Sequence, residues 1–134
     1  MPAETTGALP LQSEQHIVAS RQMVRSLCQE LKMSLVDQTK MVTAASELSR
    51  NTLTHGGGGL MRWTLCERAG RRGLTLEFED QGPGIADLAL ALTDGWTSGG
   101  GMGLGLPGSK RLVNDFDIDS APGRGTRVSI TKWK

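Results

Sequence analysis

Several features that mark particular classes of protein are missing from this sequence. Positive charge is not in excess: Lys and Arg number 15 against 14 Asp and Glu, a formal net charge of +1, so the long-range field of a nonspecific nucleic-acid binder is absent. No apolar run approaches the roughly 20 residues of a membrane span. Residues 1–15 lack the basic start and apolar stretch of a secretory signal. We therefore expect no nucleic-acid partner, no membrane partner and a cytoplasmic location.

Cysteines, histidines and stacking aromatics are also too few to build common kinds of site. The two cysteines, Cys28 and Cys66, show no CxxC spacing, which excludes a disulfide framework and predicts reduced, largely buried thiols. The two histidines have no ligand-like neighbours, so no zinc site is predicted. One predicted hairpin gathers Arg68, Arg71 and Arg72 without stacking aromatics among them, which argues again against nucleic-acid binding.

The length of the chain fits one domain with one core. The chain has 134 residues, which is within the usual size of a single domain. Residues 1–13 mix Pro, Gly, Thr and Glu with little apolar content, and this composition predicts either a flexible leader or an edge strand. We therefore expect the folded domain to span residues 14–134.

Apolar periodicity predicts the order of helices and strands. Steps of three and four between apolar residues are typical of helices, and alternation is typical of strands. The predicted helices are 13–32, 35–54, a short one around 86–92 and 106–114, and the predicted strands cover 61–65, 74–78, 116–120 and 126–133. The glycine run 56–59 ends the second helix. This order predicts an α+β fold: a two-layer sandwich with helices on one face of a mixed, mainly antiparallel sheet.

A carboxylate and an amide share one face of the predicted helix 35–54. Glu47 and Asn51 are four residues apart, so their side chains lie one above the other. The carboxylate can accept a proton or orient a nucleophile, and a neutral amide oxygen suits Mg²⁺ as a ligand. The alternative is that both side chains are simply solvated on the helix surface.

One aspartate is predicted to point toward the apolar side of the sheet. Asp80 has the same strand parity as Leu74, Leu76 and Phe78, and a buried carboxylate needs a hydrogen-bond donor. The exocyclic amine of adenine would supply one, and the following Gly-Pro-Gly turn at 82–84 leaves room for a flat ligand. A buried water or a backbone N–H would serve the carboxylate equally.

Glycine is the residue in excess, with 18 in the chain. It is concentrated in the segment 98–106, Ser-Gly-Gly-Gly-Met-Gly-Leu-Gly-Leu, ahead of a predicted helix. Consecutive backbone N–H groups before a helix form a cradle for phosphate; a flexible surface loop is the alternative. Residues 103–108 also match GxGxxG, but no strand precedes them and no further βα units follow, so a dinucleotide-binding fold is not predicted.

A hydroxyl opens the last predicted strand. Thr126 follows Gly125 at the end of the turn 122–125, where its side chain could hydrogen-bond a nucleotide base. An ordinary hairpin residue is the alternative, because threonine is common in strands.

Taken in order, these segments resemble the three nucleotide-binding boxes of the GHKL ATP-binding superfamily. The N box resembles Glu47 to Asn51, the first glycine box resembles Asp80-Gln81-Gly82-Pro83-Gly84, and the second resembles Gly101-Met102-Gly103-Leu104-Gly105. Within the superfamily, the short chain is similar to the anti-sigma-factor-type serine/threonine kinases, and closest to the RsbT-type switch kinases of the stressosome. The resemblance covers about residues 15–133.

The resemblance implies the Bergerat ATP-binding fold, ATP and Mg²⁺ as cofactors, and a role for each matching residue. Glu47 is the implied general base toward a protein hydroxyl, and Asn51 the implied Mg²⁺ ligand. Asp80 receives the adenine amine, and Thr126 makes a second contact with adenine. The other implied nucleotide-binding residues are Gly82, Gly84 and Ile85 after the strand, and Gly101, Met102, Gly103, Leu104 and Gly105 around the phosphates.

The implied reaction is transfer of the ATP γ-phosphate to a serine or threonine of a STAS-domain antagonist protein, in a partner-switching pathway that controls a sigma factor or a stress response. A phosphatase or a sigma factor is a further implied partner, and a homodimer is left open. The alternative is a binding switch, in which nucleotide tunes the hold on a phosphatase or sigma factor without essential catalysis. Transfer of labelled phosphate to the cognate partner distinguishes the two.

Overall fold

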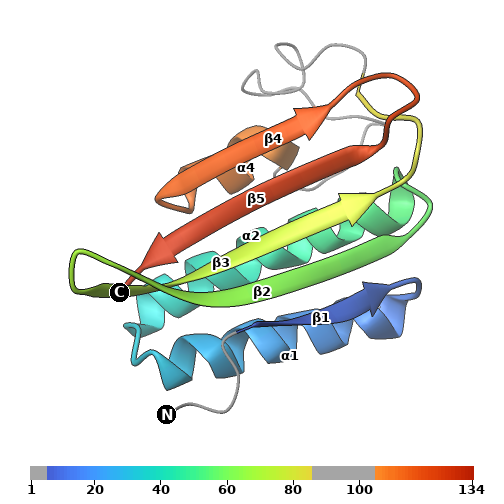
Figure 1. The fold of residues 1–134 in the computed structure, drawn as a ribbon. Coiled ribbons are helices and arrows are strands. Elements are labelled where there is room, and N and C mark those ends of the chain that lie inside the picture. Colours follow the sequence, from blue (N-terminus) through green and yellow to red (C-terminus); the bar gives the residue numbers. More distant parts are fainter. Residues whose placement is uncertain (1–5, 86–104) are drawn as a thin grey trace.

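The computed structural model describes residues 6–85 and 105–134 and arranges them in two layers (Figure 1). The elements, in chain order, are β1 (Thr6–Leu11), α1 (Glu14–Glu30), α2 (Leu35–Thr54), β2 (Gly59–Arg68), β3 (Arg71–Asp80), α4 (Gly105–Arg111), β4 (Asp115–Ser120) and β5 (Thr126–Trp133). The predicted short helix around 86–92 lies outside the described residues. The other predicted helices and strands are confirmed, with shifts at their ends. No helix of the described ranges is long and apolar enough to cross a membrane.

The five strands form one sheet in the order β1-β2-β3-β5-β4. β1 lies at one edge of the sheet, so residues 6–11 form an edge strand. The register places Met61 opposite Phe78, and Phe78 opposite Val128, so side chains of this parity face the helices together. The predicted fold class is confirmed, with a sheet that is antiparallel at each described pairing rather than mixed.

The long helices α1 and α2 cover one face of the sheet (Figure 1). Both begin at a serine whose Oγ accepts a backbone N–H: Ser13 from His16 at 3.3 Å, and Ser34 from Asp37 at 3.1 Å. Burial of their apolar faces against the sheet stabilises the helices more than intrinsic propensity does. The core between the layers includes Val24, Leu27, Met41, Leu48, Met61, Leu76, Phe78 and Ile130.

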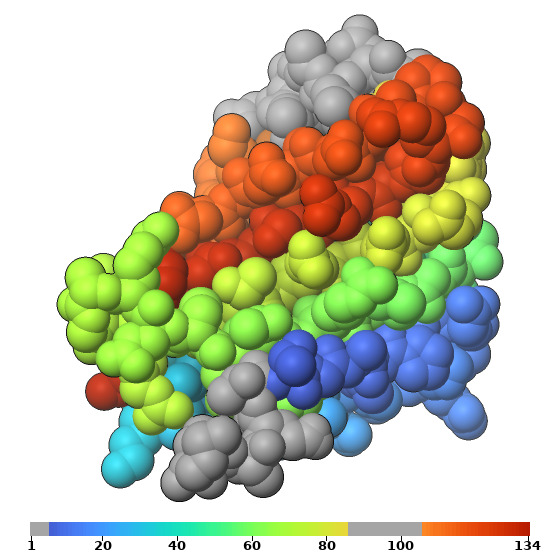
Figure 2. Space-filling view, viewed as in Figure 1, coloured from blue at the N-terminus to red at the C-terminus, as the bar shows by residue number. Residues whose placement is uncertain are grey.

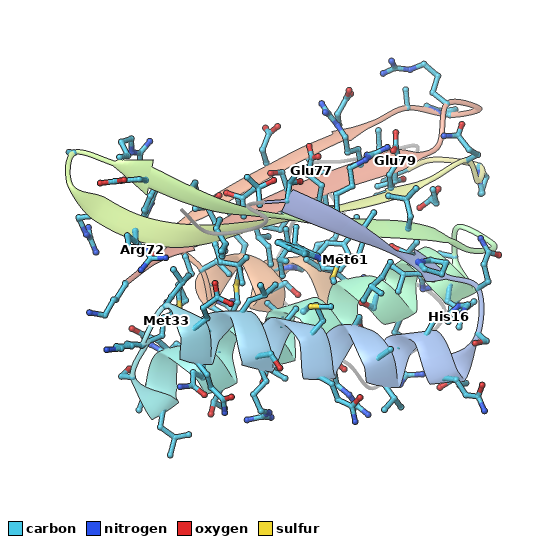
Figure 3. All side chains as sticks on the ribbon, turned by 60° about the horizontal axis from the view of Figure 1, so that its bottom comes forward. His16, Met33, Met61, Arg72, Glu77 and Glu79 are labelled. Atoms are coloured by element: carbon cyan, nitrogen blue, oxygen red, sulfur yellow. The ribbon has the colours of Figure 1, made fainter. Side chains whose placement is uncertain are left out.

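The other face of the sheet is polar. Figure 2 views this face, with the strands lying side by side and coloured by their place in the sequence. Glu77 and Glu79 point away from the helices, whereas Met61 lies between the layers (Figure 3). Each glutamate pairs with an arginine on a neighbouring strand, Glu77 with Arg127 at 3.5 Å and Glu79 with Arg62 at 2.8 Å. Exposed pairs of this kind each contribute at most about 1 kcal/mol. The apolar core is therefore confined to the side that the helices cover.

The prediction that the arginine hairpin lacks a stacking aromatic is wrong. Trp133 is remote in sequence, but it pairs with Gly73 of β3 in the sheet. Its ring centroid consequently lies 4.6 Å from Arg68 Cζ, within the range of a cation–π contact. The indole Nε1 donates a hydrogen bond of 2.9 Å to Asp115 Oδ2. The ring is thus engaged by the chain's own arginine and aspartate.

A lysine is buried at the same end of the sheet as Trp133. Lys132 is 7% exposed; its Nζ donates to the Leu112 carbonyl at 3.3 Å and lies 3.7 Å from Asp37 Oδ1. The cation thereby links β5 to the end of α4 and to the first turn of α2.

Burial raises the pKa of Cys28 to about 11, so this thiol stays protonated and inert. Both cysteines are free, as predicted, although Cys66 is only half-buried.

Candidate functional site

Asp80 ends β3 and points to the helix side of the sheet, as its parity predicts. Its side chain is nearly buried, with 8% of the residue exposed. Oδ1 accepts a hydrogen bond of 2.9 Å from the Gly82 backbone N–H, so the backbone alternative is realised for this oxygen. The Gly82 bond leaves Oδ2 available for a second donor, because a carboxylate accepts through both oxygens.

Close backbone packing surrounds this carboxylate. A Cβ on Gly56 would overlap the Asp80 carboxylate, and a Cβ on Gly82 would press on the backbone of Gly56. The end of α2 and the turn after β3 can therefore meet only because both positions lack a side chain. Gly56 was missed as a site residue, and its only signal in the sequence is its place in the glycine run 56–59.

The first glycine box packs against the turn between β4 and β5. Gly84 has φ +78°, a backbone conformation that favours glycine, and a Cβ there would overlap the Ala121 carbonyl. The next residue, Ile85, donates its backbone N–H to Ser120 Oγ at 2.8 Å. Gly82, Gly84 and Ile85 therefore hold the turn after Asp80 beside the start of β5.

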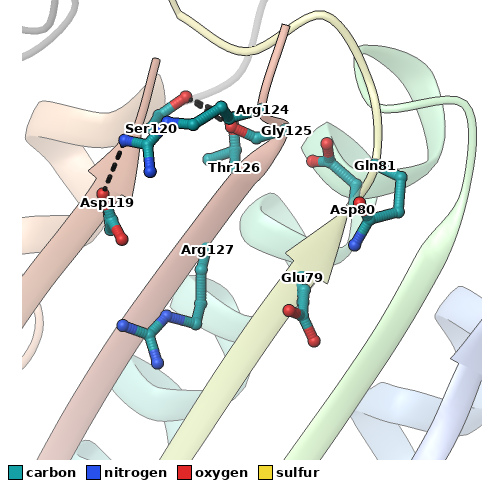
Figure 4. Close-up of a pocket in the computed structure, with 9 residues that line it drawn as sticks. All are labelled: Glu79, Asp80, Gln81, Asp119, Ser120, Arg124, Gly125, Thr126 and Arg127. Carbon is teal, nitrogen blue, oxygen red and sulfur yellow. Dashed lines mark hydrogen bonds and ion pairs between the residues drawn. The ribbon is translucent and has the colours of Figure 1, made fainter.

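Asp80, Thr126 and Ser120 form one row across three strands. Thr126 is the register partner of Asp80 on one side and of Ser120 on the other, so the two residues predicted to contact adenine are neighbours in the sheet. Figure 4 shows the hollow of about 270 Å³ at this end of the sheet. Its lining residues are Glu79, Asp80, Gln81, Asp119, Ser120, Arg124, Gly125, Thr126 and Arg127.

Ser120 is a second residue that the sequence analysis missed. Its Oγ lies 2.8 Å from Thr126 Oγ1 and 2.9 Å from the Gly125 carbonyl. The signal was present in the sequence, because Ser120 continues the inward parity of Phe116 and Ile118 on the predicted strand. Its significance depends on the pairing with Thr126, which the structure shows across the turn 122–125.

Asn51 lies near the Asp80 end, on the last turn of α2. Its side chain is half-buried, and its carbonyl accepts backbone N–H groups from His55 at 2.9 Å and from Gly56 at 3.3 Å. Since Gly56 contacts Asp80, the Asn51 turn leads directly into the packing around the carboxylate. Among the described residues, no three His, Cys, Asp or Glu side chains could hold a metal ion by themselves.

Glu47 lines a second hollow, of about 470 Å³, between α1 and α2. The lining comprises Val18, Arg21, Gln22, Arg25, Val42, Thr43, Ser46 and Glu47. None of these residues lines the hollow at Asp80. Glu47 and Asn51 thus share a helix, as predicted. In the described residues, however, Glu47 lines a hollow with residues of α1, whereas the turn after Asn51 contacts Asp80 through Gly56.

The second glycine box is mostly outside the described residues. Gly101, Met102, Gly103 and Leu104 belong to the part of the chain that is not described, and Gly105 is the first residue of α4. α4 contacts α2, and its end is linked to Lys132 through the Leu112 carbonyl. The predicted phosphate role of this box stays a prediction.

Residues 36–134 match the family model described as the histidine kinase-, DNA gyrase B- and HSP90-like ATPases. The chain is 42% identical over 123 residues to the serine/threonine-protein kinase RsbT of Bacillus subtilis, covering 92% of each chain. It is 31% identical over 121 residues to the anti-sigma F factor of Clostridium acetobutylicum, covering 84% of this chain and 82% of that one.

A solved structure of the RsbU and RsbW domains of Rv1364c from Mycobacterium tuberculosis has the same fold, with a TM-score of 0.64 and 18% identity. The match covers 98% of this chain and 33% of that chain. Fold and sequence therefore confirm the resemblance drawn from the three boxes. The chain belongs to the histidine kinase-, DNA gyrase B- and HSP90-like ATPase family and, within it, to the ATP-using serine/threonine protein kinases of the partner-switching type.

Proposed function

We propose that the chain transfers the γ-phosphoryl group of ATP to a serine or threonine of a STAS-domain antagonist protein, acting through a domain that spans residues 14–134. The observation that carries this proposal is the row of Asp80 and Thr126 on the helix side of the sheet, where Asp80 packs against Gly56 at the end of the helix that bears Glu47 and Asn51. RsbT of Bacillus subtilis bears the name of a serine/threonine-protein kinase, which supports the class of acceptor.

Adenine is proposed to bind with its exocyclic amine at Asp80. Oδ1 is already used by the Gly82 N–H, so Oδ2 is the oxygen assigned to the amine. A charged acceptor forms the stronger kind of hydrogen bond. Gly82, Gly84 and Ile85 shape the wall beside the base, and Thr126 supplies the second polar contact.

Mg²⁺ fits the donor set at Asn51. One neutral amide oxygen, without a ring of carboxylates, suits an ion that keeps several waters and takes its other ligands from phosphates. When bound, Mg²⁺ neutralises charge on the transferring phosphates. Gly101, Met102, Gly103, Leu104 and Gly105 are proposed to surround those phosphates with backbone N–H groups.

Glu47 is proposed as the general base. Its carboxylate takes the proton of the acceptor hydroxyl while the hydroxyl oxygen bonds to the γ-phosphorus, the bond from that phosphorus to the β–γ bridging oxygen breaks, and ADP leaves. Glu47 lies one turn before Asn51 on α2, so its carboxylate is close to the Mg²⁺ and phosphates proposed at Asn51.

A second candidate function is favoured by the similarity to an anti-sigma F factor. In this alternative the chain binds a sigma factor or a phosphatase, and bound nucleotide changes the affinity for that partner without essential catalysis. The two functions differ in whether phosphate moves, because both require the nucleotide site at Asp80.

The test is recovery of partners from a lysate of the source organism, with and without MgATP, followed by mapping of phosphorylated residues. The proposal expects a STAS-domain protein that carries a new phosphoserine or phosphothreonine only when ATP and an intact Glu47 are present. A stable, nucleotide-dependent complex without any phosphorylated partner would contradict the kinase assignment and support the binding switch. The matched control is Glu14→Gln, because Glu14 is exposed on α1 and pairs only at the surface with Arg50.

A further inference from the structure

The Ser120 hydroxyl, which Figure 4 shows near Gly125 and Thr126, makes three hydrogen bonds. It accepts from the Ile85 backbone N–H at 2.8 Å. It also lies 2.9 Å from the Gly125 carbonyl oxygen and 2.8 Å from Thr126 Oγ1. These contacts use the whole hydrogen-bonding capacity of a serine hydroxyl, which is one proton and two lone pairs.

The chemistry of the three partners fixes the direction of each bond. A carbonyl oxygen can only accept, so the single Ser120 proton is donated to Gly125. A backbone N–H can only donate, so Ile85 occupies one lone pair of Ser120 Oγ. The remaining contact is satisfied only if Thr126 donates its proton to Ser120. Thr126 Oγ1 is then left with lone pairs, and it faces any ligand as an acceptor.

This acceptor stands beside a second one. Thr126 is the register partner of Asp80, and a carboxylate also accepts hydrogen bonds. Both side chains have the inward parity of their strands and therefore lie on the helix side of the sheet. A ligand that meets both groups must therefore present two protons, and the exocyclic amine of adenine carries two. A purine with a carbonyl oxygen in place of the amine would bring an acceptor against two acceptors.

We propose that Ser120 is a specificity-determining positioning residue, which holds the Thr126 proton and thereby makes the pocket select 6-amino purines over 6-oxo purines. This inference rests on the proposed nucleotide function of the site at Asp80. It goes further by assigning a role to a residue outside the three boxes and by placing the two amine protons on Asp80 Oδ2 and Thr126 Oγ1.

The experiment compares the affinities of ATP and inosine triphosphate, measured by calorimetry with Mg²⁺. The parent protein is expected to prefer ATP by at least about 100-fold, since a site built to accept an N–H strongly rejects an analogue that lacks it. In Ser120→Ala the Thr126 hydroxyl can rotate and donate to the 6-oxo group. The preference is then expected to fall by about tenfold, the effect of one hydrogen bond of ordinary strength. A purely structural role of Ser120 would weaken both nucleotides equally and leave their ratio unchanged.

Two further variants keep the test decisive. Ser120→Thr keeps the hydroxyl and should retain the parent ratio. In a chain that already carries Thr126→Val, Ser120→Ala should no longer change the ratio, because Ser120 acts through Thr126. If Ser120→Ala fails to fold, Ser120→Cys replaces it, since a thiol is a weak acceptor and should also lower the ratio.

The failure of this inference differs from the failure of the proposed function. Parent protein that binds ATP, with an unchanged ratio in Ser120→Ala or Ser120→Cys, would overturn the role of Ser120 and leave the nucleotide site standing. Parent protein that binds neither nucleotide would overturn both the proposed function and this inference.

Discussion

The two ends of the sheet treat buried polar groups in opposite ways. At one end, the Lys132 cation is enclosed and finds both of its partners, the Leu112 carbonyl and the Asp37 carboxylate, within the chain. At the other end, one oxygen of Asp80 accepts a hydrogen bond from Gly82, and Thr126 donates its hydroxyl proton to Ser120 in the arrangement proposed above. The first arrangement is complete and stabilises the fold, whereas the second leaves acceptors on the helix side of the sheet that a ligand can meet.

The comparison teaches how the same strands serve two purposes. β3 and β5 run the length of the sheet and carry inward apolar side chains along their middle. Polar residues replace them only at the ends, where the inward positions are Asp80 and Thr126 at one end and Lys132 at the other. Substitutions at the two ends should therefore separate binding from stability.

The largest effect is expected at Glu47, which belongs to neither end of the sheet. Glu47→Ala removes the proposed base and should lower phosphate transfer to the partner by roughly 10²–10⁴-fold. ATP affinity and thermal stability should stay near those of the parent, because the helix and the Asp80 end are untouched. Quantified transfer of labelled phosphate checks this, with calorimetry as the binding measurement. Transfer at the parent rate would remove Glu47 from the mechanism.

At the ligand end, Asp80→Asn replaces one acceptor of the carboxylate by an amide donor. ATP affinity should fall by about 10- to 100-fold, because a charged hydrogen bond to the amine is lost and an amide proton takes its place. Calorimetric titration of MgATP measures the change. The matched control is Asp117→Asn on exposed β4, which should bind ATP as the parent does. Equal affinity in both variants would rule out the contact between Asp80 and adenine.

At the anchored end, Lys132→Met should act on stability and leave nucleotide binding unchanged. Removal of the cation leaves the Leu112 carbonyl and the partly exposed Asp37 without this partner, at a cost of about 1–3 kcal/mol in the free energy of unfolding. Urea unfolding measures the loss. The comparison between the two ends would break down if ATP affinity fell as strongly in this variant as in Asp80→Asn.

The smallest effect is expected at the exposed hairpin. Arg68→Ala removes a cation–π contact with Trp133 and a surface ion pair with Asp115 at 3.7 Å, together worth about 1 kcal/mol of unfolding free energy. The neighbouring Arg72→Ala is the control, with a predicted change near zero. Chemical unfolding of both variants side by side provides the measurement. A loss of several kcal/mol in Arg68→Ala would show that this end carries more of the stability than its exposed contacts indicate.

Local pattern was sufficient for much of the fold. Apolar periodicity gave α1, α2 and four strands. Parity alone placed Asp80 on the helix side of β3. These features depend on residues a few positions apart, and such spacing is visible in a sequence.

Contacts between distant segments were not predictable in the same way. The tertiary fold decides that Trp133 reaches Arg68 and that Gly56 packs on Asp80. No local spacing encodes these pairs. The separate hollow at Glu47 likewise depends on how α1 packs beside α2. The three boxes thus contained most of the candidate site residues, whereas the supporting residues were identified only from the contacts in the folded structure.

The most direct test of the account is a structure of the protein grown with Mg²⁺ and a non-hydrolysable ATP analogue. The account predicts the adenine amine within hydrogen-bond distance of both Asp80 Oδ2 and Thr126 Oγ1, with Mg²⁺ on the Asn51 amide oxygen. A nucleotide bound at another surface, or crystals that hold none at saturating concentration, would contradict the assignment of this end of the sheet to ATP.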